Sequence, residues 1–136
     1  MARRTERECY VDTSALIAFL DRSDSFHALF RRLFSAPPPL VASSLVIAEG
    51  HGWFLRRYDE RRAGQFLAFV RELPGLTMCP FGDVELVAAA KVFTRFLDQK
   101  LTLADCHGLV VMAERRIQTC WSTDRHLGLT DVALVI

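Results

Sequence analysis

Short apolar runs alternate along the chain with longer stretches in which apolar residues recur every three or four positions. Five runs have the length and composition of β-strands, at residues 8–12, 40–42, 76–79, 119–122 and 132–136. The stretches between them predict six helices. The first three begin at Thr13 or Ser14, span 25–34, and run from Ser43 or Ser44 to about 58. The other three run from 59 to near Pro74, over 83–97, and from a Thr102 cap through 116. This alternation predicts an α/β fold of three layers, α/β/α, around a mostly parallel sheet of about five strands.

The length of the chain fits one domain. Its 136 residues are 51% hydrophobic, which is enough for one sizeable core and too short for two ordinary domains. No apolar run reaches the roughly 18 residues of a membrane span, and the charged N-terminal segment lacks the apolar core of a signal peptide. We therefore expect a single domain over residues 1–136, cytoplasmic and without a membrane partner.

The net charge of +1 does not by itself indicate a nucleic-acid-binding protein. The kind of basic residue is more informative, because only Lys91 and Lys100 among the 17 basic residues are lysines. Arginines recur as pairs, at 3–4, 31–32, 56–57, 61–62 and 115–116. Arginine suits bidentate contacts with phosphate. The simpler interpretation is a set of solvated helix faces, and the alternative is a track for RNA.

The four cysteines do not predict a metal site. Cys9, Cys79, Cys106 and Cys120 show no C-x-x-C spacing, so a zinc ribbon or a thioredoxin-type motif is not indicated. Cys106 and His107 are adjacent, and adjacent residues on a helix point in different directions. We expect free, mostly buried thiols.

Two aspartates directly follow predicted strands. Asp12 closes the first run, in YVDTSALIAFL, and Asp124 comes after the fourth, in TCWSTD. Functional residues of parallel α/β sheets gather at the carboxyl ends of the strands. The alternatives are local: Asp12 would cap the next helix, and Asp124, which stands next to the hydroxyls of Ser122 and Thr123, would cap a helix or take part in a turn.

Glu49 interrupts the apolar face of a predicted helix. It shares this face with Val46, Gly50 and Trp53, and an unpaired buried carboxylate is costly. The alternative is a surface glutamate on an imperfect apolar face. Gly50 and Gly52 are unfavourable in a helix, so their presence suggests that something approaches this backbone closely.

Asp105 is the acid that local structure explains most easily. Thr102-x-x-Asp105 matches a capping box, which needs no further function. A carboxylate in the first turn is also favoured by the helix dipole. The two interpretations are compatible, since a capping aspartate can also face a site.

A parallel sheet could bring all four acids to one edge: Asp12, Glu49, Asp105 and Asp124. Two carboxylates about 4 Å apart repel by about 4 kcal/mol at an effective dielectric of about 20, so either some protonate or a cation binds. Oxygen ligands favour Mg²⁺ or Mn²⁺ over zinc, and such an ion supports hydrolysis of a phosphodiester. The hydroxyls of Thr13, Ser14 and Thr123 are candidates to support the ligands.

Four segments of the chain resemble a known family. YVDTSALIAFLDRSDSFH, SSLVIAEG, LTLADCHGLVVMAERR and STDRHLGL are similar, in order and spacing, to PIN-domain ribonucleases, specifically the VapC-type toxins of bacterial toxin–antitoxin pairs. Together they cover nearly the whole chain. One departure is in the last segment, where the family commonly has an aromatic or apolar residue two places past the Asp–Arg pair and this chain continues with His126 and Leu127.

Attack of a metal-bound water on a phosphodiester would leave 5′-phosphate and 3′-hydroxyl ends. The resemblance implies a PIN-like fold and an endoribonuclease that depends on Mg²⁺ or Mn²⁺. It implies Ser14 and Thr123 as supporting hydroxyls. It also implies a homodimer, and a small antitoxin whose C-terminal segment lies over the acidic pocket. The acids it assigns to metal binding and catalysis are Asp12, Glu49, Asp105 and Asp124.

Three other functions remain as alternatives. One is a PIN-fold RNA-processing nuclease that has no antitoxin. Another is a phosphohydrolase of the haloacid-dehalogenase type, since Asp12 and Thr13 follow a strand, but that family's second acid is replaced here by Ser14. The third is a non-catalytic binding module, against which the presence of all four acids argues.

Overall fold

A computed structural model describes residues 7–128 and 133–135 of the protein. Its strands are β1 (Cys9–Val11), β2 (Leu40–Ser43), β3 (Leu76–Cys79), β4 (Thr119–Trp121) and β5 (Ala133–Val135). They form one five-stranded sheet in the order β3-β2-β1-β4-β5, and each neighbouring pair is parallel. The predicted sheet is confirmed. The outer positions of the last predicted strand, 132 and 136, lie outside the described residues.

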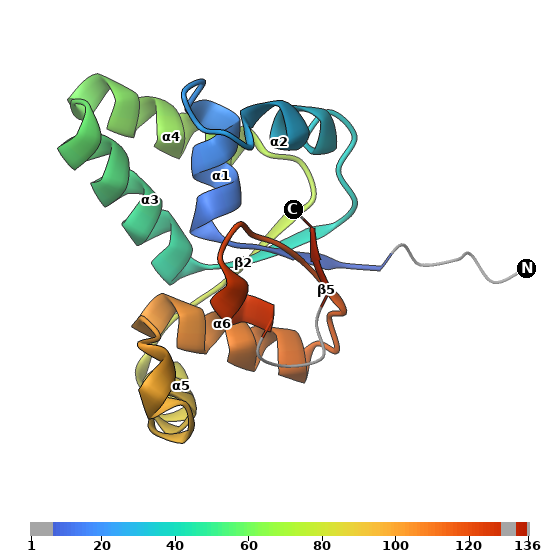
Figure 1. The fold of residues 1–136 in the computed structure, drawn as a ribbon, viewed down its shortest axis with the longest axis vertical. Coiled ribbons are helices and arrows are strands. Elements are labelled where there is room, and N and C mark those ends of the chain that lie inside the picture. Colours follow the sequence, from blue (N-terminus) through green and yellow to red (C-terminus); the bar gives the residue numbers. More distant parts are fainter. Residues whose placement is uncertain (1–6, 129–132, 136) are drawn as a thin grey trace, which may run out of the picture.

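Helices cover the sheet on both sides (Figure 1). They are α1 (Thr13–Leu20), α2 (His27–Leu33), α3 (Ser44–Arg57), α4 (Glu60–Glu72), α5 (Asp83–Arg95) and α6 (Leu103–Glu114). In this view α1 and α2 lie above the sheet, α5 and α6 lie below it, and α3 and α4 form a hairpin at the upper left. The predicted α/β/α layers are confirmed. Within the described ranges, no helix has the length and apolar character needed to cross a bilayer.

Local hydrogen bonds explain where the helices begin. The Ser43 hydroxyl accepts from the Leu45 N–H at 3.1 Å and caps α3. The Asp59 carboxylate accepts from the Arg62 N–H at 2.9 Å and caps α4. Helix α2 begins at His27, two residues later than predicted, because the Asp24 carboxylate accepts from the Phe26 N–H at 2.8 Å and holds a turn there.

The ends of two helices also differ from the prediction. Helix α5 ends at Arg95, because a 3₁₀ turn at Leu97–Gln99 follows it and Lys100 then adopts a left-handed φ of 54°. Helix α6 ends at Glu114, and Arg116 has a φ of 55°. These corrections shorten the helices without changing the order of elements.

The core lies between the sheet and the helices. The strands bury Tyr10, Val11, Val41, Cys120 and Trp121, and the helices bury Leu16, Phe30, Phe66 and Met112 against them. A fully buried side chain of this size contributes about 1.5–3 kcal/mol. All four cysteines are free thiols, as predicted, with Cys106 and Cys120 buried.

The close approach predicted at Gly50 is made by a phenylalanine of the next helix. A Cβ at Gly50 would lie 2.2 Å from Cζ of Phe66. Helices α3 and α4 therefore pack with the buried Phe66 ring directly against the Gly50 backbone. This contact fixes the position of the α3–α4 hairpin, and with it the side chains that α3 carries.

Candidate active site

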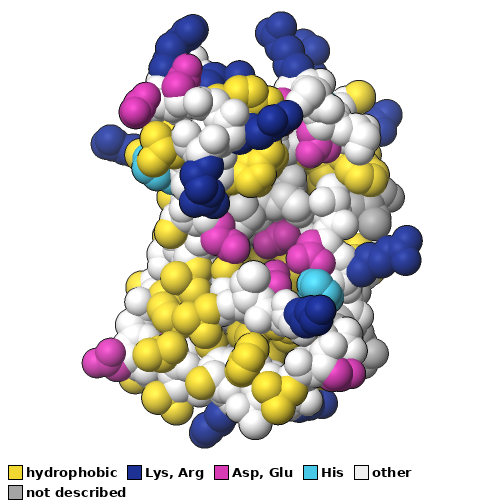
Figure 2. All heavy atoms as spheres, turned by 60° about the vertical axis from the view of Figure 1, so that its left-hand side comes forward, with side chains coloured by type: hydrophobic (Ala, Val, Ile, Leu, Met, Phe, Trp, Pro, Cys, Tyr) yellow, Lys and Arg dark blue, Asp and Glu magenta, His cyan; other side chains and the backbone are white. Residues whose placement is uncertain are grey.

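All four predicted acids line one pocket of about 300 Å³. Figure 2 shows acidic side chains gathered in a hollow in the middle of one face of the molecule. The pocket lies at the carboxyl ends of β1 and β4, where α1, α3 and α6 meet. Strand β1 has β2 on one side and β4 on the other, so the winding of the chain changes direction beside this pocket. Ligands of open α/β sheets bind at such a point.

Asp12 is held by two hydroxyls and does not cap a helix. It occupies the N-cap position of α1, but its side chain makes no capping hydrogen bond. Its Oδ2 accepts from the hydroxyls of Ser14 and Ser122, both at 3.0 Å. Burial raises the pKa of Asp12, and the charge of Asp105 raises it further, while the two hydroxyls oppose the shift.

Glu49 lies at the open side of the pocket and has a hydrogen-bond partner. The Thr13 hydroxyl donates to its Oε1 at 3.1 Å. Loss of hydration raises the pKa of Glu49, the Thr13 hydrogen bond lowers it, and the charges of the three aspartates raise it again. The side chain remains exposed to solvent, which weakens these charge effects. Glu49 therefore faces the other acids across the pocket.

Asp105 caps its helix and also lines the pocket. Its Oδ2 accepts from the Thr102 N–H at 2.9 Å, and its own N–H donates to the Thr102 hydroxyl at 3.1 Å. The predicted capping box is confirmed. Among the described residues no hydrogen bond reaches Oδ1, so the cap leaves one carboxylate oxygen for the pocket. Asp105 is therefore both a capping residue of α6 and an acid of the pocket.

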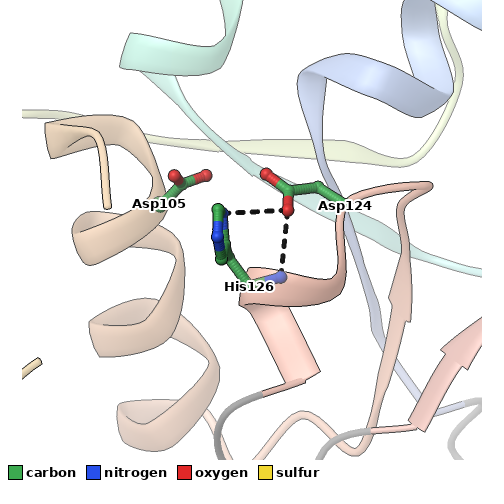
Figure 3. Close-up of side chains that lie close together, drawn as sticks. All are labelled: Asp105, Asp124 and His126. Carbon is green, nitrogen blue, oxygen red and sulfur yellow. Dashed lines mark hydrogen bonds and ion pairs between the residues drawn. The ribbon is translucent and has the colours of Figure 1, made fainter. Parts of the chain in front are cut away.

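A histidine lies close to two of the acids and interacts with one of them, Asp124 (Figure 3). Ligand atoms of Asp105, Asp124 and His126 all lie within 4.8 Å of one another. Oδ1 of Asp124 accepts from the His126 N–H at 2.9 Å and lies 3.1 Å from its Nδ1. His126 was not among the predicted site residues and stood out in the sequence only as part of a departure from the family pattern. Its spacing two residues past Asp124, in a 3₁₀ turn over Arg125–Gly128, is the signal that would have found it.

The supporting hydroxyls differ in what they contact. Ser14 donates to Asp12 and accepts from the Thr123 N–H at 3.0 Å. Ser122 donates to Asp12 and accepts from the Asp124 N–H at 2.8 Å, so it links the two aspartates. For the Thr123 hydroxyl itself, no hydrogen bond is found among the described residues. Ser122 was not among the predicted supporting hydroxyls, although it contacts both aspartates.

The donor set suits a hard divalent cation. Four carboxylates line the pocket, and the His126 imidazole lies beside two of them. Among the described residues, no arginine or lysine forms an ion pair with these acids. Lost hydration is the main cause of the raised pKa values of Asp12 and Glu49, and the negative charge of the neighbouring acids adds to it. Mg²⁺ or Mn²⁺ would offset this negative charge, because both prefer oxygen ligands and Mn²⁺ also accepts an imidazole.

Comparison with known proteins agrees with this fold. A family model described as PIN domain matches residues 9–133. Ribonuclease VapC26 of Mycobacterium tuberculosis is 34% identical over 122 residues, which is 85% of each chain.

Solved structures share the fold. A Mycobacterium tuberculosis structure of VapC20, described as a sarcin–ricin loop cleaving toxin, has a TM-score of 0.80 at 23% identity, over 92% of this chain and 98% of that one. VapBC2 from Rickettsia felis, bound to a promoter DNA fragment, has a TM-score of 0.63 at 12% identity, over 94% and 97%. A toxin–antitoxin complex from Klebsiella pneumoniae has a TM-score of 0.60 at 16% identity, over 94% and 96%. The family model and the 34% identical relative each cover most of the chain, which therefore belongs to the PIN-domain family, as a relative of the VapC-type ribonucleases.

Proposed function

We propose that the protein is a metal-dependent endoribonuclease that hydrolyses RNA phosphodiester bonds, and that it is the toxin of a type II toxin–antitoxin pair. One observation carries the activity: four acids from separate parts of the chain line a single pocket. The 34% identical relative is named a ribonuclease, which supports the same reaction.

Mg²⁺ or Mn²⁺ is the proposed cofactor. When bound, such an ion supplies a water of lowered pKa and a countercharge for the phosphate. Its proposed ligands and catalytic acids are those lining the pocket: Asp12, Glu49, Asp105 and Asp124.

The protein's own contribution is to hold the acids in place before any ligand arrives. Asp12 is fixed by Ser14 and Ser122, and Glu49 is oriented by Thr13. Side chains already fixed by hydrogen bonds lose little freedom when a cation or substrate binds. Ser14 acts through Asp12, and we retain Thr123 as a second supporting position because its backbone N–H binds Ser14.

RNA cleavage in Mg²⁺ or Mn²⁺ tests this proposal. Asp12→Asn and Asp105→Asn should each lower the rate by at least about a hundredfold, on the scale of losing a metal ligand or its support. Asp98→Asn is the matched control, because Asp98 is an exposed aspartate that does not line the pocket. Equal rates in the wild type and both pocket variants would contradict the assignment.

Direct metal binding gives an independent readout. Titration calorimetry with Mn²⁺ should detect binding to the wild type and to Asp98→Asn, and much weaker binding to Asp105→Asn. Failure of the wild type to bind either ion at millimolar concentration would favour a non-catalytic module.

The proposed protein partners are a small antitoxin and a second copy of the chain. Similar folds include VapBC2 and a toxin–antitoxin complex, which supports the first. A short reading frame for a DNA-binding protein directly upstream is expected, and its product should co-purify with the chain and suppress RNA cleavage. Light scattering should give twice the chain mass. Absence of the reading frame would favour a solitary RNA-processing nuclease.

A further inference from the structure

The pocket has a wall that cation binding does not explain. Besides the acids and hydroxyls it is lined by Ile17, Trp53 and Arg56. Glu49, Trp53 and Arg56 stand at positions i, i+4 and i+7 of α3, so they lie on one face of the helix. This face therefore presents a carboxylate, an indole and a guanidinium in succession beside the pocket.

Trp53 packs against two other aromatic rings and also lines the pocket. It packs edge-on against Phe54, with ring centroids 4.9 Å apart at 85°, and contacts Tyr58 at 6.1 Å. The side chain is half-buried and lines the pocket. The chain has two tryptophans, and the other, Trp121, is only 4% exposed. An indole cannot ligate a cation, but it offers a surface on which a nucleobase stacks.

Arg56 reaches back along α3 over a glycine. A Cβ at Gly52 would lie 2.9 Å from Nη1 of Arg56, so the absence of a side chain at Gly52 makes room for the guanidinium. Helical side chains lean toward the N-terminus of the helix, which here is the direction of Glu49 and the pocket. This contact accounts for the second mid-helix glycine of α3.

The Arg56 guanidinium is available to an anion. In the part of the chain that the structure describes, the ion pairs are Arg115 with Glu8 and His126 with Asp124. Arg56 is exposed and takes part in neither. An unpaired arginine can bind a phosphate through two parallel N–H groups. A polyanion that approaches four carboxylates needs such a cation beside them.

Further arginines continue from the pocket toward the tip of the α3–α4 hairpin. The Arg62 guanidinium lies 4.5 Å from the centroid of the Tyr58 ring, and that of Arg57 lies 5.6 Å from it. Figure 2 shows Lys and Arg side chains on the part of this face above the acidic hollow. Of the two interpretations of the arginine pairs, a track for RNA is the one this placement favours.

We propose that Trp53 and Arg56 form a nucleotide-binding subsite for single-stranded RNA, in which the indole stacks on the base beside the scissile bond and the guanidinium binds a neighbouring phosphate. This inference rests on the proposed ribonuclease function. It adds a position for the bound RNA along the face of α3. It also requires that the stacked base be unpaired, because a base within a duplex cannot present its face to the indole.

Binding of a fluorescent single-stranded RNA oligonucleotide tests the subsite, in an Asp105→Asn background so that the RNA stays intact. Trp53→Ala and Arg56→Ala should each weaken binding about tenfold, on the scale of one lost stack or phosphate contact. Trp53→Phe should recover most of the loss, because a phenyl ring still stacks. Arg32→Ala is the charge-matched control, since Arg32 is an exposed arginine of α2 that does not line the pocket.

Tryptophan emission gives a second readout. RNA should quench Trp53, and Trp53→Phe should abolish the quenching while leaving the emission of buried Trp121. The subsite is refuted if Trp53→Ala and Arg56→Ala bind RNA as Arg32→Ala does, or if quenching persists in Trp53→Phe.

Mn²⁺ calorimetry separates this outcome from failure of the ribonuclease proposal. Trp53→Ala and Arg56→Ala, with Asp105 restored, should bind Mn²⁺ as the wild type does. Normal Mn²⁺ binding and RNA cleavage with unchanged RNA affinity would overturn only the subsite. Absence of Mn²⁺ binding and of RNA cleavage in the wild type would overturn the proposed ribonuclease function. The RNA affinities of Trp53→Ala and Arg56→Ala would still decide whether the subsite exists.

Discussion

Asp12 is a buried carboxylate, which costs stability in its charged form, although the proposed cation binding requires that charge. It is a buried acid, 6% exposed, whose pKa is raised by lost hydration and by the charge of Asp105. The folded protein therefore holds the Asp12 proton more tightly than the unfolded chain does. Linkage then requires the metal-free protein to lose stability as the pH rises from the ordinary aspartate range through the raised pKa.

Asp12→Asn should remove this pH dependence. The amide cannot ionise, so the metal-free variant should be more stable than the wild type at neutral pH, and the difference should shrink at a pH below about 4, where a free aspartate is protonated. Urea unfolding in the presence of a chelator, at a series of pH values, measures this. A variant that is less stable than the wild type at neutral pH would show that the hydroxyl contacts outweigh the lost hydration.

Ser122→Ala tests the hydroxyl that links two acids. The change removes a buried donor to Asp12 and the partly buried acceptor of the Asp124 N–H, and should cost about 1–3 kcal/mol of unfolding free energy. Thr123→Ala is the neighbouring control and should stay within about 0.5 kcal/mol. Chemical denaturation compares the two. A Thr123→Ala variant that is stable but slow in RNA cleavage would support the predicted role of that hydroxyl.

At the scale of elements, alanine substitutions at Gly50 of α3 and Gly64 of α4 should change the stability of the hairpin in opposite directions. Gly50→Ala places a methyl group 2.2 Å from the Phe66 ring, so α4 must shift, at a cost of about 1–3 kcal/mol. Gly64→Ala meets nothing within 4 Å on α4 and should stabilise by up to about 1 kcal/mol. Denaturant midpoints at constant slope measure both. Equal effects would mean that Phe66 moves aside freely.

Gly52→Ala should change stability and RNA binding in opposite directions. Alanine favours the helix by up to about 1 kcal/mol, and the atom it would meet is the far end of a flexible arginine, which can move away. That movement displaces the Arg56 guanidinium from its place over α3. We therefore expect a higher melting temperature and weaker binding of the RNA oligonucleotide. Unchanged RNA binding would show that Arg56 does not need this position.

The sequence predicts elements better than it predicts their ends. Apolar runs and 3.6-residue periodicity identified each strand and helix, because both reflect burial against a single sheet. The start of α2 and the end of α5 were misplaced, since a local turn at Asp24 and a left-handed residue at Lys100 decided them. Such hydrogen bonds depend on a few atoms and leave little trace in a periodic pattern.

At the scale of the whole molecule, cation binding and folding should be coupled. The pocket joins acids from α3, α6 and the ends of β1 and β4, so it exists only in the folded chain. Mn²⁺ at a hundredfold excess over its Kd should stabilise the wild type by about 2.7 kcal/mol. Thermal melts with and without a chelator measure this, and Asp105→Asn should show a much smaller change. An equal shift in that variant would place the ion elsewhere.

The parallel order of strands predicted that Asp12 and Asp124, which follow β1 and β4, lie at one edge of the sheet. Glu49 and Asp105 stand on helices, and the pattern allowed them at that edge without requiring it. The hydrogen-bond partners of the acids were not predictable. Thr13 and Glu49 are 36 positions apart, and Ser122 and Asp12 are 110 apart, so their hydrogen bonds depend on how elements pack rather than on local spacing. The position of Trp53 and Arg56 beside the pocket could not be predicted for the same reason. The residues that this face of α3 lies against depend on how α3 packs in the folded protein.

The separation of Asp12 and Ser122 by 110 positions also has a consequence during synthesis. Chains leave the ribosome from the N-terminus, and β1 is made long before its neighbour β4. Until β4 emerges, β1 has β2 on one side only, Asp12 lacks its Ser122 partner, and Asp124 does not yet exist. A chain that has not yet been made through Asp124 therefore cannot assemble the acidic pocket, so the proposed hydrolysis has to wait for that part of the chain.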